Sequence, residues 1–333
     1  MLASPAAFRR TLLAWYSRHG RDLPWRRTRD PYAILVSEIM LQQTPVATVI
    51  PYYERWLRRF PDFASLAAAP QSDVLHAWQG LGYYARARNL HAAAKAIVAQ
   101  HGGDFPRDIE EARKLPGLGR YTANAVATFA FDSSVPIIEA NTARLLARLT
   151  NLRERIDSSS GRDKLWSFAA SVLPTRAAGT YNSALMDLGA TVCTAGEPKC
   201  DICPVHRFCH ADAPALLPIK KARAQTKALT ERHLFALRRG RILLEQSAER
   251  WRGMWILPRL NGDEPGALLH RAAFPFTHHR ITLDVFANAS RARAAQPGES
   301  WFVVAQTNSI PMPSPHRRAL EAILRANAAR EHN

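Results

Sequence analysis

The stretch KLPGLGRYTANAVATFAF, residues 114–131, sets the fold expectation for this chain. Gly117 and Gly119 stand on either side of a single leucine, so a tight turn there carries no side chains on one face. Backbone N–H groups can then approach a phosphate closely at the start of the next helix. Leu115 is expected to anchor the turn in a core, and Arg120 adds positive charge beside it. The pattern is typical of two helices joined by a hairpin that contacts an anion.

The bulk charge supports a polyanionic partner for this hairpin. The chain has 333 residues, a net charge of +17 at pH 7 and a sequence pI near 10.5. Such an excess favours nucleic acid first and an acidic membrane surface second, while charge that serves only solubility is the simpler alternative. Taken alone, the glycine turn also fits an ordinary connection between two helices. Together, charge and turn favour a helix-hairpin-helix clamp, which contacts the DNA backbone and carries no sequence information.

The distribution of apolar residues favours a folded protein outside the membrane. An apolar content of 47% is enough for a sizeable core and excludes global disorder. No segment approaches the ~18 uninterrupted apolar residues of a membrane helix. At the N-terminus no long apolar run comes before Arg9 and Arg10, so the segment lacks the order of regions found in a signal peptide. We therefore expect a cytoplasmic protein without a membrane partner.

Helical signals and a change in composition divide the chain. Residues 1–212 are dense in helical patterns, and residues 213–231 are rich in proline and basic residues, as in a basic linker. Residues 232–333 contain strand patterns, notably HHRITLDVFA (278–287) and WFVVAQT (301–307). The sequence therefore predicts a helical domain, a linker and a smaller α/β domain, in agreement with the length of the chain.

Capping signals predict where several elements begin. Asp30 and Thr44 each precede a proline, which is the arrangement of a helix N-cap followed by proline at the first helical position. Asn141 is expected to cap the helix that follows it. In the C-terminal part we expect two strands about a turn at Gly240 and a closing helix that begins near Ser314.

Glu38 is an ionisable group within VSEIMLQQTPV (36–46), a run that otherwise reads as buried helix. If residues 31–43 form one helix, three of the four side chains at three or four positions from Glu38 are apolar. Burial disfavours the charged form of a carboxyl, so its pKa should rise and leave an acid that is protonated near neutral pH. The alternative is a buried glutamate satisfied by an arginine or by backbone groups.

All four cysteines lie in one short segment, at Cys193, Cys200, Cys203 and Cys209. A reducing cytosol argues against disulfides, so the clustering indicates a metal site. Structural zinc usually shows two C-x-x-C pairs, whereas only one pair is present here. Four thiolates with this uneven spacing suit an iron–sulfur cube at least as well. Zinc and free thiols remain the alternatives.

Together these features resemble one family, the helix-hairpin-helix DNA glycosylases with an iron–sulfur cluster, and most closely its MutY-type adenine glycosylases. The matching stretches span nearly all of residues 20–210 in order: LPWR (23–26), SEIMLQQT (37–44), GLGYYARARNL (80–90), LPGLGRYTA (115–123), MDLGATVC (186–193) and the cysteine spacing. More thinly, WRGMWILP (251–258) and FTHHRITLDV (276–285) resemble the Nudix-like domain that reads 8-oxoguanine in that family. The resemblance implies a mainly α helix-hairpin-helix glycosylase domain with a 4Fe-4S loop over 193–209, then an α/β Nudix-like lesion-recognition domain.

The resemblance also implies an activity. Such enzymes act in base excision repair on double-stranded DNA, where they remove adenine mispaired with 8-oxoguanine or guanine after flipping it into a pocket. Glu38 matches the general acid that protonates adenine N7, and cleavage passes through an oxocarbenium-like sugar. Trp25, Arg26 and Asp187 fall where the family lines the base pocket. A monomer that works in the cytoplasm at the bacterial nucleoid is expected.

Further residues match the family's contacts to DNA. Gln43 and Tyr83 match residues wedged into the duplex near the lesion, and Thr44 matches a lesion contact. Two tyrosines in GYYARARNL are more often core than wedge, so at least one is expected to pack. A final set matches the family's lesion reader with threonine in place of serine, or alternatively forms a strand-edge turn: Phe276, Thr277 and His278.

Two positions distinguish this chain from its relatives. Endonuclease III-like enzymes carry a lysine where Tyr121 stands, so an efficient lyase is not expected. The family has Asp-Gly-Asn where this chain has Glu139, Ala140 and Asn141, and the aspartate stabilises the sugar cation. The longer glutamate leaves three outcomes: an enzyme that works with a shifted backbone, a weakened enzyme, or a glycosylase for another mispair or lesion. An iron–sulfur protein that binds DNA without catalysis is the alternative from a second class. An endonuclease III-like enzyme is the weakest option.

Overall fold

The computed structural model describes residues 2, 4–222, 225–260, 266–288 and 294–331. The chain forms two compact units, one of Met1–Ala67 with Ala92–Ala222 and one of Ala68–His91 with Arg223–Asn333. The second unit thus includes Ala68–His91, a segment that the division at residues 212 and 232 does not anticipate. The position of the 213–231 linker stays a prediction.

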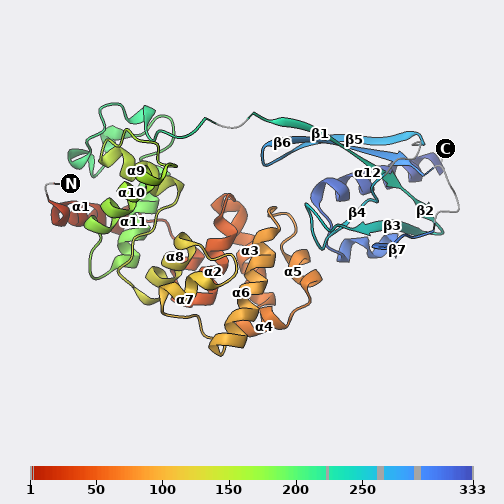
Figure 1. Cartoon of the computed structure of the whole chain (residues 1–333), viewed down its shortest axis with the longest axis horizontal. Helices are drawn as coiled ribbons and strands as arrows, with labels where there is room; N and C mark the ends of the chain where they lie inside the picture. Colours follow the sequence, from red (N-terminus) through yellow and green to blue (C-terminus); the bar gives the residue numbers. More distant parts are fainter. Residues whose placement is uncertain (1, 3, 223–224, 261–265, 289–293, 332–333) are drawn as a thin grey trace. The chain divides into compact units, whose positions relative to one another are not determined.

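Helices dominate the part of the chain before residue 200 (Figure 1). They are α1 (Pro5–His19), α2 (Pro31–Leu41), α3 (Val46–Arg59), α4 (Phe63–Ala68), α5 (Gln71–Ala77), α6 (Ala85–His101), α7 (Ile109–Lys114), α8 (Arg120–Phe131), α9 (Ala140–Leu149), α10 (Ser159–Val172) and α11 (Ala178–Thr191). This content confirms the mainly α prediction. Within the described residues, none of the helices has both the length and the apolar character needed to cross a bilayer.

Helix α2 lies at the centre of the first unit, where it packs against α3 and α8. Every residue from Tyr32 to Met40 is buried, the pattern of a helix surrounded by protein. Asp30 caps α2 as predicted, because its side chain accepts a hydrogen bond from the Tyr32 amide. The predicted start of the helix that carries Glu38 is therefore confirmed.

The predicted cap at Thr44 is wrong. Helix α3 begins at Val46, and Pro45 occupies the N-cap position without a side-chain hydrogen bond. The reason lies one residue earlier, where Gln43 adopts a φ of +59° and turns the chain between α2 and α3. The Thr44 amide donates to the Leu41 carbonyl across this turn, so Thr44 belongs to the turn and not to the next helix.

The hairpin between α7 and α8 forms as predicted. Gly117 has a φ of +77°, a conformation that favours glycine, and Gly119 occupies the N-cap position of α8. Leu115 and Leu118 are each only 4% exposed, so both anchor the turn in the core. A Cβ at Gly119 would meet no other atom within 4 Å, which leaves the N-terminal amides of α8 open on that side.

The C-terminal unit contains two small sheets and a helix. One sheet has the order β1 (Lys227–Phe235), β6 (His279–Ala287), β5 (Leu268–Phe276), with β1 parallel and β5 antiparallel to β6. The other contains β2 (Leu237–Arg238), β3 (Arg241–Gln246), β4 (Trp255–Ile256) and β7 (Glu299–Val303). Helix α12 (Ser314–Glu331) packs against β5. These elements confirm a smaller α/β part.

Two strand predictions need correction at their ends. The strand expected over 278–287 begins at His279, because the two residues before it form the β5–β6 turn. The strand expected over 301–307 ends at Val303, where a 3-10 helix over Val304–Ser309 takes over. The predicted turn at Gly240 is confirmed, with a φ of +71° between β2 and β3.

Candidate active site

A cavity of about 780 Å³ opens in the first unit among α2, α8, α9 and α11. Its lining brings together eight residues that the sequence selects: Trp25, Arg26, Glu38, Gln43, Thr44, Tyr121, Glu139 and Asn141. Asp187 is not among its lining residues. The volume lies within the usual range for a small-molecule site, so a base-sized ligand fits.

Glu38 is the buried acid of this cavity. Its side chain comes from α2, is 3% exposed at the residue level, and accepts a 2.6 Å hydrogen bond from the Tyr121 hydroxyl on α8. Burial raises the pKa of Glu38 to about 7, and the negative charge of Glu139 adds to that rise. The Tyr121 hydrogen bond and Arg26 act in the opposite direction. Near neutral pH the carboxyl is therefore poised to give or take a proton.

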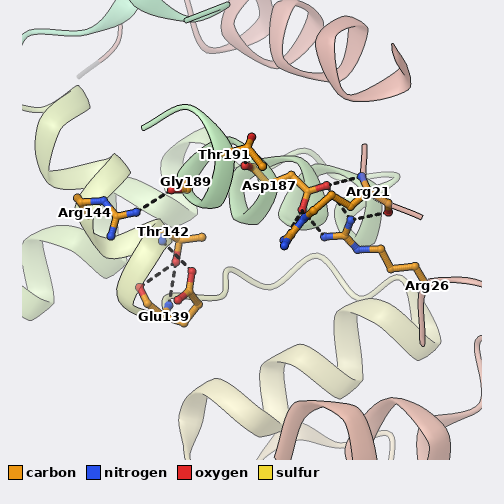
Figure 2. A network of polar contacts seen from close by, with 8 residues as sticks. All are labelled: Arg21, Arg26, Glu139, Thr142, Arg144, Asp187, Gly189 and Thr191. Atoms are coloured by element: carbon orange, nitrogen blue, oxygen red, sulfur yellow. Dashed lines mark hydrogen bonds and ion pairs between the residues drawn. The ribbon is translucent and has the colours of Figure 1, made fainter. Parts of the chain in front are cut away.

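Glu139 caps helix α9 with its own side chain. Oε2 accepts from the Asn141 amide at 2.8 Å. Oε1 accepts from the Thr142 amide at 2.9 Å, while Thr142 Oγ1 accepts from the Glu139 amide at 2.8 Å (Figure 2). This reciprocal arrangement is a capping box. The predicted cap at Asn141 is wrong, because Glu139 satisfies the free amides. Ala140 starts the helix and therefore needs no positive φ.

Asn141 is held by an arginine instead. Its Oδ1 accepts a 2.9 Å hydrogen bond from Arg144, which also donates to the carbonyls of Gly189 and Cys193 at 2.6 and 2.8 Å. Gly189 allows α11 to approach this point, since a Cβ there would lie 3.0 Å from Asn141 Cβ. The start of α9 is thus fixed by contacts to α11 and to the segment that carries the first cysteine.

Asp187 holds two arginines that line the cavity but does not line it itself. It is fully buried on α11 and binds both Arg21 and Arg26 (Figure 2). Arg26 makes two hydrogen bonds to it, at 2.7 and 2.8 Å, and Arg21 adds its amide at 2.8 Å. Burial favours a higher pKa, but the hydrogen bonds from Arg26 and Arg21 hold the pKa of Asp187 below its ordinary value. Sequence reasoning missed Arg21, because no pattern separates it from other surface arginines.

Arg120 of the hairpin is also paired with a residue that the sequence analysis missed. Its guanidinium carbon lies 3.7 Å from the ring centre of Trp166, on α10. A cation over an aromatic face is stabilised by the ring quadrupole. The contact holds the exposed Arg120 side chain beside the open amides of Gly119 and the start of α8.

The remaining residues for which the sequence analysis predicts a DNA contact lie in the second unit. Tyr83 is 44% exposed and adopts a φ of +48°. Thr277 and His278 form the β5–β6 turn, where Thr277 has a φ of +51° and its hydroxyl donates to the Phe276 carbonyl at 2.7 Å. The strand-edge turn that the sequence offered as an alternative is present, and a lesion contact by these residues stays a prediction.

The four cysteines line one small cavity, next to Arg148 of α9. Arg148 donates to Cys193 Sγ at 3.3 Å, and burial raises the pKa of Cys203 to about 11, with a further rise from the neighbouring thiols. In the part of the chain that the structure describes, no three His, Cys, Asp or Glu side chains are placed to hold a single metal ion. Four converging thiols without a carboxylate nevertheless form a donor set that suits an iron–sulfur cluster.

Comparisons with known proteins support one family. A model of the HhH-GPD superfamily of base excision DNA repair proteins matches residues 36–170. The adenine DNA glycosylase of Buchnera aphidicola (Schizaphis graminum) is 30% identical over 94% of this chain and 98% of its own length. The adenine DNA glycosylase of Mycolicibacterium smegmatis is 43% identical over 70% of this chain and 78% of its own length.

Other similarities cover less of the proteins compared. The adenine DNA glycosylase of Rattus norvegicus is 44% identical over 63% of this chain, which spans only 42% of that relative's length. Among solved structures, a thermostable thymine-DNA glycosylase matches with a TM-score of 0.56 and 30% identity, over 62% of this chain and 95% of that one. An endonuclease III–DNA intermediate matches with a TM-score of 0.53 at 24% identity, over 63% and 97%, a likeness of fold alone.

Proposed function

The chain belongs to the adenine DNA glycosylase family of helix-hairpin-helix base excision repair proteins, and on that premise we propose that it removes adenine mispaired with 8-oxoguanine or guanine from double-stranded DNA. The observation that carries the proposal is Glu38, a buried carboxyl with a pKa of about 7 in a cavity large enough to admit a base. The net charge of +17 and the α7–α8 hairpin support a DNA substrate.

Glu38 acts as the general acid. Its raised pKa keeps a substantial protonated fraction near neutral pH, and this proton passes to N7 of the extruded adenine. Protonation makes the base a better leaving group. The 2.6 Å hydrogen bond from Tyr121 fixes one carboxyl oxygen, Oε2, and leaves Oε1 free to carry the proton. Trp25 and Arg26 line the same cavity and form the base pocket, with Arg26 held in place by Asp187.

Glu139 stabilises the sugar cation that forms as the glycosidic bond breaks. Two backbone amides, those of Asn141 and Thr142, hold its carboxylate at the start of α9, so the longer side chain has little freedom to move. We infer that the extra methylene relative to aspartate is absorbed by this capping geometry and that the enzyme works with Glu139 in place.

A monofunctional enzyme follows from the residue opposite Glu38. Tyr121 occupies the position where a lysine would attack the sugar, and among the described lining residues none is a lysine. Water, rather than a protein amine, is therefore the nucleophile in the final step. The protein should release adenine and leave an intact strand with an abasic site.

The four cysteines are proposed as the ligands of a 4Fe-4S cluster: Cys193, Cys200, Cys203 and Cys209. When bound, such a cluster supplies folding energy and a fixed geometry to the loop around it. Arg148 and Arg144 connect this loop to α9, so the loop supports the helix that Glu139 caps.

Contacts to the duplex are assigned to two further sets of residues. Phe276, Thr277 and His278, at the β5–β6 turn, are proposed to read the lesion. Gln43 and Tyr83 are proposed to wedge into the duplex beside it.

Single-turnover base release tests the proposal. Wild type and Glu38→Gln are incubated in excess over duplexes with an 8-oxoguanine:A, G:A, G:T or G:U pair. The proposal expects adenine release from 8-oxoguanine:A by wild type alone. Release of thymine from G:T would favour the second candidate, a glycosylase for another mispair, which the similarity to a thymine-DNA glycosylase supports. Equal binding by both proteins without base loss would favour a non-catalytic DNA-binding role.

A further inference from the structure

The loop Gly80–Tyr84, between α5 and α6, carries an aromatic side chain into solvent. Tyr83 is 44% exposed, although tyrosine usually has its ring covered, and its φ of +48° is unfavourable for any residue other than glycine. Its neighbours Gly80 and Gly82 also have positive φ angles, of 104° and 70°. The two glycines adopt these angles freely, so the strain lies at Tyr83, whose ring the loop presents to solvent. Such strain persists only where surrounding contacts enforce it.

Arg86 supplies those contacts from the first turn of α6. It is 8% exposed, and its Nη2 donates to the carbonyls of Leu81 at 3.1 Å and Gly82 at 3.2 Å. These are the two residues directly before Tyr83. The Trp78 indole donates to the same Gly82 carbonyl at 3.0 Å. Side-chain donors therefore hold the carbonyls of both Leu81 and Gly82.

The same guanidinium also contacts two aromatic rings. Its central carbon lies 5.3 Å from the Trp78 ring centre and 5.6 Å from the Tyr83 ring centre. Both distances lie within the range of a cation–π interaction. Burial lowers the pKa of Arg86 to about 10, so the group stays charged at neutral pH. Trp78, Arg86 and Tyr83 thus form a layered unit, from the buried indole to the exposed phenol.

We propose that Arg86 is a positioning residue that holds the Tyr83 ring in the orientation in which it wedges into duplex DNA beside the displaced base. This inference rests on the proposed function, since it assumes that Tyr83 meets DNA. An arginine is required because its flat guanidinium presents faces to aromatic rings while its edge donates to two carbonyls. A lysine keeps the charge, but its compact ammonium has no flat faces to lie against the rings, so it cannot make both kinds of contact.

The test follows base extrusion by fluorescence. A duplex with 2-aminopurine next to the target adenine brightens when the stack is broken, and Glu38→Gln is used throughout to prevent cleavage. Arg86→Lys should slow the fluorescence rise about tenfold, the kinetic equivalent of one lost cation–π contact with its hydrogen bonds. Arg88→Lys is the matched control, because Arg88 lies two positions further along α6 and its side chain donates to the Arg252 carbonyl instead of to the loop carbonyls.

A double-mutant cycle distinguishes positioning of the Tyr83 ring from a purely structural role of Arg86. If Arg86 acts through the ring, then Arg86→Lys should slow extrusion no further in a Tyr83→Ala background. Equal extrusion rates with and without Arg86→Lys, or additive losses in the double variant, overturn this inference. The proposed function still stands in that case if the wild type releases adenine. A wild type that neither extrudes the base nor releases adenine overturns the proposed function and this inference together.

Discussion

The hydroxyl of Tyr121 donates a 2.6 Å hydrogen bond to Glu38, a carboxyl that burial otherwise shields from water. Two opposing effects therefore set the acidity of Glu38. Burial and the nearby Glu139 charge raise its pKa, while Tyr121 and Arg26 lower it, and the balance lies at about 7. Each neighbour can be changed separately, so the sign of each effect can be measured.

Replacement of Tyr121 should move the pH dependence of base release upward. Tyr121→Phe removes the hydrogen bond that lowers the pKa of Glu38, so the alkaline limb of the rate profile should shift to higher pH. The measurement is the single-turnover rate between pH 5 and 9. Tyr32→Phe is the control, because it removes a buried hydroxyl that donates to the Phe60 carbonyl and not to Glu38. A downward shift with Tyr121→Phe contradicts the assignment.

Removal of the second carboxylate should move the same limb in the opposite direction. Glu139→Gln deletes the charge that raises the pKa of Glu38, so the limb should fall to lower pH. Loss of cation stabilisation should also reduce the maximal rate by ~10²-fold or more. Glu139→Asp keeps the charge and is a favoured N-cap, so it should retain most of the activity. Unchanged profiles in Glu139→Gln would rule out this electrostatic coupling.

Glu38 should limit stability at alkaline pH. Its folded-state pKa of about 7 lies above the ordinary value of 4.5, so its favourable contribution is complete below 4.5 and is lost as pH rises through 7. Glu38→Gln removes this loss. The variant should therefore be more stable than wild type at pH 8.5, by up to about 3 kcal/mol, and the advantage should vanish near pH 4.5. Urea unfolding at both pH values measures the difference, and equal midpoints at pH 8.5 contradict it.

Asp187 should be more important for folding than any exposed acid. Asp187→Asn leaves Arg21 and Arg26 without the buried carboxylate that both contact, and breaking such a pair costs about 3–5 kcal/mol. Asp22→Asn is the matched control, because the Asp22–Arg27 pair is exposed and solvent screens it, so its loss should change the stability far less. Urea denaturation of the two variants compares them directly, and a similar loss in both would refute the ranking.

Arg120 and Trp166 should govern the electrostatic part of DNA binding. Arg120→Ala should weaken binding to any duplex and lower the slope of log K against log salt by about one. Trp166→Ala should weaken binding less, because the charge remains but loses the ring at 3.7 Å that orients it. Trp166→Phe keeps an aromatic face and should restore most of the loss. Sequence-dependent effects of Arg120→Ala would contradict a backbone contact.

The sequence was informative wherever local chemistry decided the structure. Asp30 caps α2, the glycines at 117 and 119 shape the hairpin, and the apolar neighbours of Glu38 correctly indicated its burial. The same signals could not decide between competing caps. Asn141 is a better N-cap by preference, yet α9 begins at Ala140, so Glu139 occupies the N-cap position and Asn141 lies within the first turn.

The residues that were missed are mostly arginines. Arg21, Arg86 and Arg144 stand among 45 basic residues, and nothing in a single sequence separates a buried, paired guanidinium from an exposed one. Their partners are a distant carboxylate, loop carbonyls or an aromatic face, all fixed by tertiary packing. Strand β5 was missed as well, since its apolar residues do not alternate cleanly with polar ones and Pro275 lies within it.

The most direct test of the central claim is the pH profile of single-turnover adenine release from an 8-oxoguanine:A duplex. With Glu38 as the acid, the wild-type rate should be highest below pH 7 and fall tenfold per pH unit above it, while Glu38→Gln releases no adenine at any pH. A wild-type rate that stays constant from pH 6 to 9, or undiminished release by Glu38→Gln, would contradict the account.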